Sequence, residues 1–290
     1  MDLNFEEFSF RVADGTKLSG RDYGRRVSDR RPVVCLAGLT RNVRDFDALA
    51  QALSCRARPR RVIALDYRGR GKSDHAPAKT YTVPVEASDV LAGITARGIS
   101  EAHFVGTSRG GLLCMAIGAL RPGLLKTVVL NDIGPVIHVA YLAGIKAHVA
   151  GQATPSSWEA AARALQTAYE GAFTRMSSED WSRLARQFYA DENGRPTLAF
   201  DTALAEGLDS ITETTPPASI WPQFGTLSSI PVLALRGENS PLLDQKTFHA
   251  MGRSHTGLEM YLVPHEGHAP LLWDKPSQSR IARFFDSHEE

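Results

Sequence analysis

One short segment of the sequence carries the residue types needed for nucleophilic catalysis. Ser108 is flanked two positions away on either side by Gly106 and Gly110, the apolar run 102–106 before it predicts a strand, and the apolar run 112–120 after it predicts a helix. A sharp strand-to-helix turn crowds the backbone around its serine, needs small neighbours, and leaves the hydroxyl exposed at the end of a sheet. The free N–H groups and positive dipole end of the helix favour negative charge there. We therefore favour a nucleophilic Ser108 over a serine that only caps the helix.

A serine hydroxyl is a weak nucleophile and needs a base to accept its proton. The sequence offers one in the segment 263–270, after the last predicted strand, where two histidines occur. We favour His268, which follows a glycine, and expect His265 to be a surface loop residue. The other histidines are expected to be structural or exposed; they include His75, His103, His138 and His249.

The elements that must position these residues can be predicted from hydrophobic patterning. The segment from Phe5 to Tyr23 alternates in polarity around Asp14-Gly15, which predicts a hairpin of two antiparallel strands. Short apolar runs then alternate with helix-compatible stretches. The runs are Pro32 to Leu36, Arg61 to Leu65, Ala102 to Gly106 and Thr127 to Leu130. This alternation predicts parallel strands joined by crossover helices.

The alternation stops after Gly134-Pro135. Residues 136–224 read as one helix after another, which predicts an inserted helical cap whose aromatic residues mostly pack its own helices together. These aromatics include Trp158, Phe173, Trp181 and Phe188.

Beyond the cap the strand pattern resumes at Pro231 to Leu235 and at Leu258 to Val263, and a last amphipathic helix is expected after Pro276. The predicted core therefore has two parts, residues 1–135 and 225–290, with the cap between them.

Several motifs, in the same order along the chain, resemble those of the α/β-hydrolase superfamily, and the resemblance covers essentially the whole sequence. Besides the turn around Ser108, the segment from Cys35 to Asn42 resembles the loop after the family's third strand, and the segment from Asp66 to Asp74 is similar to the family's Asp-x-Arg-Gly-x-Gly-x-Ser motif. The resemblance implies an α/β fold with a mostly parallel twisted sheet of about eight strands, flanked by helices. The cap then corresponds to the family's lid, and the chain order of catalytic residues is Ser, acid, His.

By the same resemblance, an oxyanion hole would be built from the backbone N–H groups of Leu39 and Arg109. Each donor aimed at a developing oxyanion contributes on the order of 3 kcal/mol to transition-state stabilisation. The chain has Ala37-Gly38 where the family normally has His-Gly or Pro-Gly. For the side chain of Arg109 two directions stay open, one toward the sheet edge and one toward a substrate carboxylate.

The acid of the triad is where the sequence departs from the family. The family usually supplies an Asp shortly after its seventh strand, but Ser240 or Pro241 stands at that place, with Glu238 and Asp244 nearby. The fold can also offer an acid at the end of its sixth strand, where Asp132 is found. We predict that Asp132 orients the catalytic histidine; the alternative is a capping or turn role for this aspartate.

Composition narrows the range of partners. The 290 residues contain 33 Lys and Arg against 32 Asp and Glu, so no strong net field attracts nucleic acid or anionic membrane. Arginines gather at 25–31 and 56–61 without interleaved aromatics, which predicts solvated charge rather than phosphate contacts. No apolar run is long enough to cross a bilayer.

The three cysteines, Cys35, Cys55 and Cys114, show neither a disulfide framework nor metal-ligand spacing. The acidic start of the sequence is unlike a secretory signal. Together these features predict a cytoplasmic setting, and none of them indicates an oligomeric state.

The residues and the resemblance together predict a serine hydrolase of a small ester-like or related carbonyl substrate, working through an acyl-enzyme. Ser108 attacks, His268 takes and returns the proton, and Asp132 orients the imidazole, with no metal or organic cofactor. Two alternatives stay open. One is hydrolysis of a carbon-carbon bond in a β-diketone-like ring-cleavage product by the same residues; the other is a ligand-binding protein in which catalysis has decayed, which the departure at the usual acid position would explain.

Overall fold

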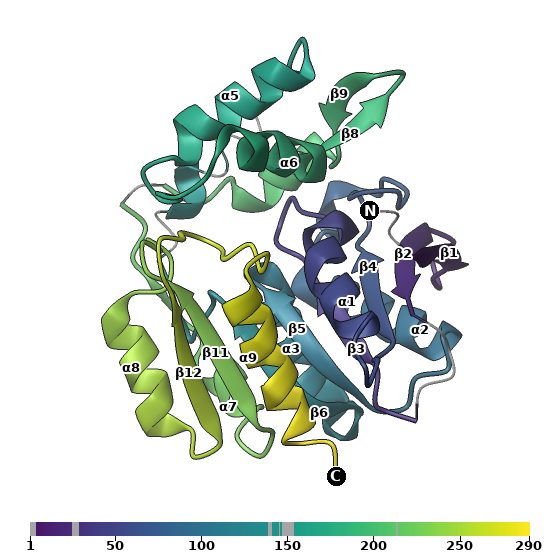
Figure 1. The fold of residues 1–290 in the computed structure, drawn as a ribbon, viewed down its shortest axis with the longest axis vertical. Coiled ribbons are helices and arrows are strands. Elements are labelled where there is room, and N and C mark those ends of the chain that lie inside the picture. The colour runs from purple at the N-terminus through teal and green to yellow at the C-terminus, as the bar shows by residue number, and fades with distance from the viewer. Residues whose placement is uncertain (1–3, 25–28, 139–140, 145, 147–153, 213) are drawn as a thin grey trace.

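A computed structural model describes residues 4–24, 29–138, 141–144, 146, 154–212 and 214–290. Its main sheet has eight strands in the order β1-β2-β4-β3-β5-β6-β11-β12 (Figure 1). The strands are β1 (Phe5–Arg11), β2 (Lys17–Tyr23), β3 (Val33–Leu36), β4 (Val62–Asp66), β5 (Ala102–Thr107), β6 (Leu125–Asn131), β11 (Val232–Gly237) and β12 (Leu258–Val263).

Strands β1 and β2 form the predicted antiparallel hairpin, and β2 also pairs antiparallel with β4. The strands from β4 to β12 in the sheet order all pair in parallel. The central strands read as continuous runs of buried residues because both faces of the sheet are covered. The predicted α/β-hydrolase architecture is therefore confirmed at the level of the sheet.

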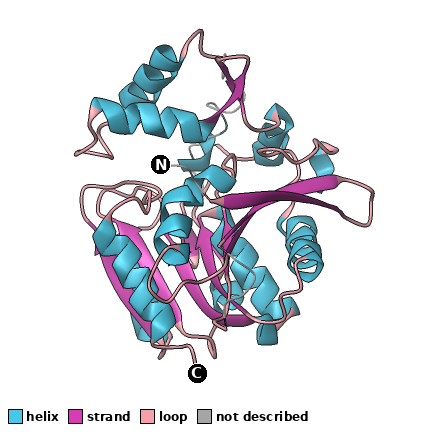
Figure 2. Cartoon of the chain, turned by 45° about the vertical axis from the view of Figure 1, so that its right-hand side comes forward, coloured by secondary structure: helices cyan, strands magenta, loops and turns pink. Residues whose placement is uncertain are grey.

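Helices cover both faces of this sheet (Figures 1 and 2). On one face, α1 (Asp47–Ser54) and α9 (Lys275–Asp286) enclose one apolar cluster. On the other face, a second cluster is enclosed by α2 (Val83–Ala96), α3 (Arg109–Leu120), α7 (Trp221–Gly225) and α8 (Gln245–Ser254). The short 3-10 helices are η1 (Val43–Phe46), η2 (Ala78–Thr80), η3 (Pro122–Leu124) and η4 (Thr202–Leu208). In the part of the chain that is described, no helix is long and apolar enough to cross a membrane.

The segment between β6 and β11 lies over the carboxyl ends of the parallel strands (Figure 1). Its helices α5 (Trp158–Tyr169) and α6 (Ser178–Phe188) pack against each other around a small apolar cluster of their own. The prediction of an all-helical segment is wrong, because α6 leads directly into a hairpin of β8 (Tyr189–Glu192) and β9 (Arg195–Leu198). At the base of the segment, β7 (Val136–Ile137) pairs with β10 (Ala218–Ser219).

The sequence contains a local signal for the β8–β9 hairpin that the prediction of helices did not take into account. Its two-residue turn is Asn193-Gly194, the sequence most typical of a turn that needs positive φ at both central positions. The structure has φ of 53° at Asn193 and 82° at Gly194.

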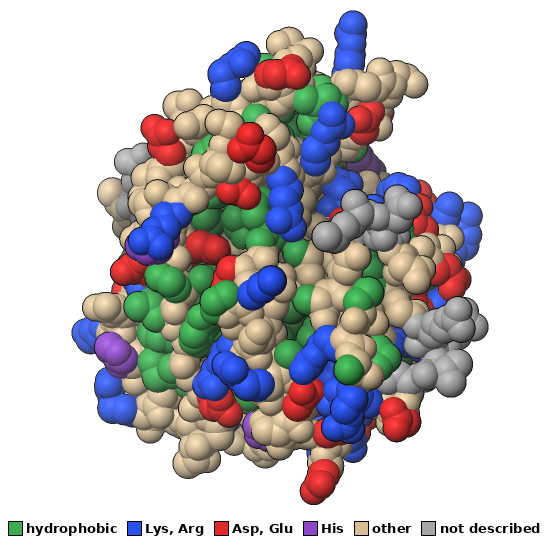
Figure 3. All heavy atoms as spheres, in the orientation of Figure 1, with side chains coloured by type: hydrophobic (Ala, Val, Ile, Leu, Met, Phe, Trp, Pro, Cys, Tyr) green, Lys and Arg blue, Asp and Glu red, His purple; other side chains and the backbone are tan. Residues whose placement is uncertain are grey.

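The arginine clusters also differ from the prediction of solvated charge. Arg30 and Arg60 are buried, and both form ion pairs with Asp286 and Glu289 near the C-terminus. Residues 25–28 of the first cluster lie outside the described residues. On the face shown in Figure 3, basic and acidic side chains are interspersed, in keeping with a balanced net charge.

Candidate active site

Four neighbouring strands end at one edge of the sheet, and each is followed by a polar residue that faces the same place. Ser108 follows β5, Asp132 follows β6, Ser240 lies just beyond β11, and His268 lies in the loop after β12. Because parallel strands present their carboxyl ends at one edge, residues far apart in sequence converge there. The register thus brings together side chains that the chain itself keeps apart.

Ser108 sits in a strained turn between β5 and α3. Its φ is 51° and its ψ −113°, outside the regions that a side chain with a Cβ normally occupies. The turn closes tightly: a Cβ on Gly110 would lie 2.0 Å from the carbonyl oxygen of Leu36, and a Cβ on Gly106 would lie 2.6 Å from the backbone of Gly110. The glycines predicted to flank the serine are therefore required by backbone contacts on both sides.

The imidazole of His268 lies between the serine and an aspartate. Its Nε2 is 2.9 Å from Oγ of Ser108, and its Nδ1 is 2.7 Å from Oδ2 of Asp132. The side chain of Asp132 is fully buried and that of His268 is 8% exposed. The ring of Tyr141 meets the imidazole edge to face, with centroids 5.7 Å apart. Burial raises the pKa of Tyr141 to about 12, so its phenol is neutral near pH 7.

Asp132 is held from the opposite side by two further donors. Its Oδ1 accepts the backbone N–H of Gly237 at 3.0 Å, and its Oδ2 accepts the hydroxyl of Ser240 at 2.5 Å. The Ser240 hydroxyl in turn accepts the backbone N–H groups of Leu242 and Leu243, each at 3.3 Å. Because both N–H groups donate to the Ser240 oxygen, the hydroxyl proton of Ser240 is directed to Asp132.

Sequence reasoning singled out Ser240 only as the residue occupying the expected place of an acid. The signal that could have identified its role was that a hydroxyl at this place, next to an aspartate one strand away, is a natural donor to that carboxylate. The structure shows this hydrogen bond.

The other two carboxylates near the expected position of the acid, Glu238 and Asp244, have different partners. Glu238 accepts the backbone N–H of His265 at 2.8 Å. Asp244 caps the start of α8 through the backbone N–H of Thr247 and pairs with His138 at 2.7 Å. Both side chains are more than a third exposed. The structure brings Asp132, and neither of these, to His268.

The two residues predicted for the oxyanion hole lie on either side of Ser108. Arg109 is the first residue of α3, and Gly38 lies so close that a Cβ placed on it would be 3.9 Å from Cβ of Ser108. The carbonyl of Gly38 accepts the N–H of Arg41 at 3.2 Å, while the N–H of Leu39 has no acceptor among the described residues. The guanidinium of Arg109 turns away from the pocket and pairs with Glu86 on α2 at 2.6 Å.

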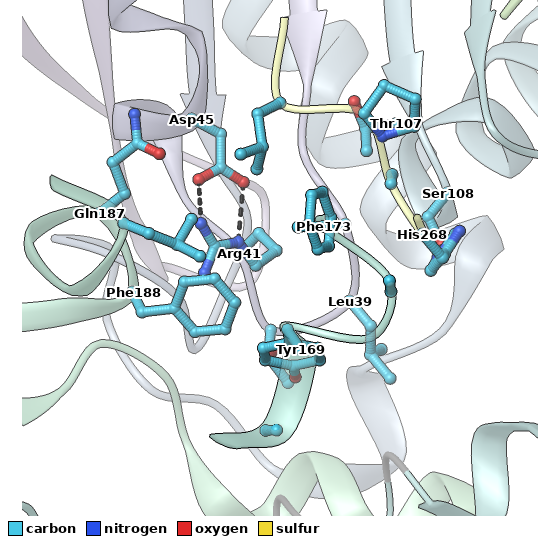
Figure 4. A pocket seen from close by; sticks show the side chains of 18 of the residues that line it. Leu39, Arg41, Asp45, Thr107, Ser108, Tyr169, Phe173, Gln187, Phe188 and His268 are labelled. Carbon is cyan, nitrogen blue, oxygen red and sulfur yellow. Dashed lines mark hydrogen bonds and ion pairs between the residues drawn. The ribbon is translucent and has the colours of Figure 1, made fainter. Parts of the chain in front are cut away.

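A pocket of about 720 Å³ opens beside Ser108 and His268 (Figure 4). Most of its wall is apolar. The wall comes from the segment between β6 and β11 and from the core loops that follow β3 and β12. Among the residues that line it are Leu39, Tyr141, Leu142, Tyr169, Phe173, Leu184, Phe188 and Leu271.

One charged pair lies in the wall across the pocket from Ser108 (Figure 4). Arg41 donates to Asp45 through Nε at 2.8 Å and also through Nη2, and its guanidinium carbon lies 3.3 Å from the ring centroid of Phe188. The pair is therefore internally neutralised, and among the described lining residues no other Lys, Arg, Asp or Glu occurs. The pocket thus presents no uncompensated formal charge near neutral pH when His268 is unprotonated.

No group of three or more His, Cys, Asp and Glu residues in the described ranges has the arrangement of a metal site. Cys35 and Cys114 are buried, and burial raises the pKa of both thiols. They contribute to the apolar clusters on the two faces of the sheet.

Comparison with known proteins agrees with the fold. Residues 33–279 match the model of the alpha/beta hydrolase family. The chain is 32% identical to the 3-hydroxybutyrate-oligomer hydrolase of Cupriavidus necator over 88% of each chain, and 29% identical to the sn-1-specific diacylglycerol lipase ABHD11 of Mus musculus over 87% of this chain and 85% of the lipase. It also superposes on the crystal structure of an alpha/beta hydrolase from Novosphingobium aromaticivorans with a TM-score of 0.89, at 34% identity and 99% coverage of both chains.

Proposed function

The chain belongs to the alpha/beta hydrolase family, and from that premise we propose that it is a serine hydrolase that cleaves an uncharged, largely apolar ester through an acyl-enzyme. The observation that carries the proposal is the hydrogen-bonded line from Ser108 through His268 to Asp132 at the floor of an apolar pocket. A serine, a base and an orienting carboxylate within hydrogen-bond distance are what acyl transfer requires.

The reaction proceeds in two halves. Ser108 Oγ attacks the ester carbonyl while His268 Nε2 takes its proton, and the oxyanion that forms is stabilised by the backbone N–H groups of Leu39 and Arg109. His268 then gives the proton to the leaving alcohol, and the acyl-serine remains. Water attacks the acyl-serine with the same base and the same donors, and the acid is released. Throughout, Asp132 holds Nδ1–H and stabilises the imidazolium.

The character of the pocket supports an uncharged substrate. Aromatic and aliphatic side chains favour apolar groups through burial, and burying an unpaired carboxylate against them is costly because the charge loses its hydration. The guanidinium of Arg41, the cation in the described wall, is already engaged by Asp45. Of the two relatives named above, the diacylglycerol lipase is named for an uncharged, largely apolar ester, which agrees with this substrate class.

A fluorophosphonate probe and matched substrates test the proposal. Wild-type protein should be labelled on Ser108, and Ser108→Ala should be neither labelled nor active. Among p-nitrophenyl esters of equal chain length, the uncharged acyl group should give a kcat/KM at least tenfold above that of the ω-carboxylate, a difference of about 1.4 kcal/mol. Turnover of a β-diketone without turnover of esters would move the assignment to carbon-carbon bond hydrolysis, and absence of labelling would favour a binding protein.

A further inference from the structure

The two backbone donors of the oxyanion hole are attached to one buried ionic network. Arg70 donates through Nε to the carbonyl oxygen of Leu39 at 2.8 Å, and its Nη1 lies 2.8 Å from Oε1 of Glu86. The other carboxylate oxygen of Glu86 accepts from Nε of Arg109 at 2.6 Å. Through Arg70, one carboxylate on α2 thus connects Leu39, which lies within the turn at 38–41, with Arg109, the residue after the nucleophile.

Burial makes this network rigid and electrostatically strong. The side chains of Arg70 and Glu86 are fully buried, and that of Arg109 is 15% exposed. Two guanidinium groups share one carboxylate, so the network carries one net positive charge. Burial lowers the pKa of Arg70 and Glu86 opposes this, but an arginine stays protonated in a protein. A fixed positive charge away from water stabilises a nearby developing anion more than an exposed charge does.

The hydrogen bonds around Leu39 show what the network holds in place. The N–H of Leu39 belongs to the peptide whose carbonyl is that of Gly38, and this carbonyl accepts the N–H of Arg41. The next carbonyl, that of Leu39, accepts from Arg70. The preceding carbonyl, that of Ala37, accepts the hydroxyl of Tyr67 at 3.0 Å. Three successive carbonyls are therefore fixed, and the orientation of the Leu39 N–H follows from theirs.

On these grounds we propose that Arg70 and Glu86 are positioning residues for the oxyanion hole: they hold Leu39 and Arg109 in register across Ser108, and Arg70 places a buried positive charge within hydrogen-bond distance of the Leu39 carbonyl. The inference rests on the proposed function of Ser108 as nucleophile. It assigns to Arg70 a role in transition-state stabilisation in addition to its structural one.

The chain offers a matched control for the experiment. Arg68, two residues earlier in the same loop, forms a buried ion pair with Asp89 on the same helix α2, at 2.6 Å, and contacts neither oxyanion residue. Arg70→Met and Arg68→Met therefore each remove one buried arginine that ties this loop to α2. A purely structural role predicts similar consequences for both variants.

We expect Arg70→Met to lower kcat for p-nitrophenyl butyrate by roughly 10- to 100-fold with KM changed less than about threefold, because the donors act on the transition state. The rate of fluorophosphonate labelling should fall in parallel. Arg68→Met should keep kcat within about threefold of wild type, even where thermal unfolding shows a loss of stability. All rates are measured at a temperature where both variants are folded by circular dichroism. If Arg70→Met does not fold, Arg70→Lys, which keeps the charge but lacks the planar fork, takes its place.

Equal losses of kcat in the Arg70 and Arg68 variants would overturn the inference, as would an unchanged kcat in the Arg70 variant or a loss confined to KM. The proposed function fails separately: there the wild-type protein is not labelled, or Ser108→Ala retains turnover.

Discussion

At Asp132 the backbone and the side chain meet different requirements. The strand β6 ends at Asn131, and Asp132 then adopts a φ of 57°, a left-handed conformation that aspartate tolerates better than most residues. Its N–H still continues the sheet by donating to Leu235 at 2.9 Å. The change of direction turns the carboxylate toward His268, so a turn residue and the partner of the histidine are the same aspartate.

The assignment of the acid can be tested by comparing three carboxylates. Asp132→Asn should lower kcat by about three to four orders of magnitude, because an amide cannot stabilise the imidazolium and favours the wrong tautomer. Glu238→Gln and Asp244→Asn should keep kcat within about threefold, since their side chains bind His265 and the start of α8. Steady-state kinetics on the three purified variants decides the matter. Full turnover in Asp132→Asn with a loss in either of the others would refute the assignment.

Ser240 should affect turnover only through its hydrogen bond to Asp132. Ser240→Ala removes the hydroxyl that donates to Oδ2; a hydrogen bond to a charged group is worth about 1.5–3 kcal/mol, and we expect part of this to appear as a roughly three- to tenfold loss of kcat with little change in KM. Ser240→Thr, which restores a hydroxyl, should recover most of the loss. A threonine variant as slow as the alanine variant would show that packing, rather than the hydroxyl, matters at this position.

At the scale of elements, the turn between β5 and α3 depends on how closely α3 approaches β3. Gly110 lies against the carbonyl groups of Leu36 and Ala37, at the end of β3. No Cβ fits there, so the close approach of helix and strand, and with it the position of Ser108, requires glycine.

Gly110→Ala should therefore destabilise the protein by about 3 kcal/mol or more, the upper range for forcing a methyl group into a packed site. Gly123→Ala is the matched control, because a Cβ at Gly123 meets no atom within 4 Å and its φ is not positive; its stability should change by less than about 0.5 kcal/mol. Urea unfolding of both variants measures the difference. Comparable stability of the two would contradict the crowding argument.

The segment between β6 and β11 is hydrogen-bonded to the core near the loop at 38–41. Asn42 and Arg44 donate to the carbonyl of Gln187 at 2.9 and 3.0 Å, and the Gln187 side chain donates back to the carbonyl of Arg44 at 3.1 Å. The end of α6, which lines the pocket, is thus hydrogen-bonded to the loop that carries Leu39. The shape of the pocket and the conformation of this loop are therefore linked through these few residues.

At the scale of the whole molecule, ion pairs at the amino ends of the parallel strands, opposite the pocket, join the residues before β3 and β4 to the C-terminal segment. Arg30 and Arg60 pair there with Asp286 and Glu289. His103, at the start of β5, lies in this region: its side chain is fully buried, stacks on Phe285 with centroids 4.6 Å apart, and is 3.7 Å from Glu289. Burial, together with the charge of Arg60, lowers the pKa of His103 to about 3.

This shift predicts a pH dependence of stability. Between pH 6.5, the ordinary pKa of histidine, and pH 3, the unfolded chain binds a proton at His103 that the folded protein does not. The contribution of a neutral His103 to the free energy of unfolding is therefore complete above pH 6.5. Below that pH the contribution is lost, at a slope of up to about 1.4 kcal/mol per pH unit. Because burial raises the pKa of Glu266 to about 7, that group acts in the opposite sense.

The test therefore compares how the free energy of unfolding depends on pH in the wild-type protein and in His103→Asn. We expect the free energy of unfolding of His103→Asn to fall less steeply than that of wild type between pH 6.5 and 5, as measured by urea unfolding at several pH values. Parallel curves over this range would show that His103 is not the titrating group.

Local patterning was enough to predict most strands, the α/β architecture, and Ser108 and His268 as candidates for nucleophile and base. The reason is that a strand-turn-helix around a serine and a Gly-His loop after a final strand are local features, and each can be read within a few neighbouring residues. The β8–β9 hairpin was equally local through Asn193-Gly194, and was missed because an Ala-rich context favoured helix.

Only the tertiary structure decided which carboxylate meets His268, and which partners hold the loop at 38–41 that carries Leu39. Asp132, Glu238 and Asp244 are chemically alike, and their distances from His268 depend on strand register and on the backbone angle at a single residue. The contacts from Arg70 to Leu39 and from Ser240 to Asp132 likewise join strand ends that are neighbours in the sheet and distant in the chain. Such pairs leave no periodic trace in the sequence, since the parallel pairing that creates them is non-local.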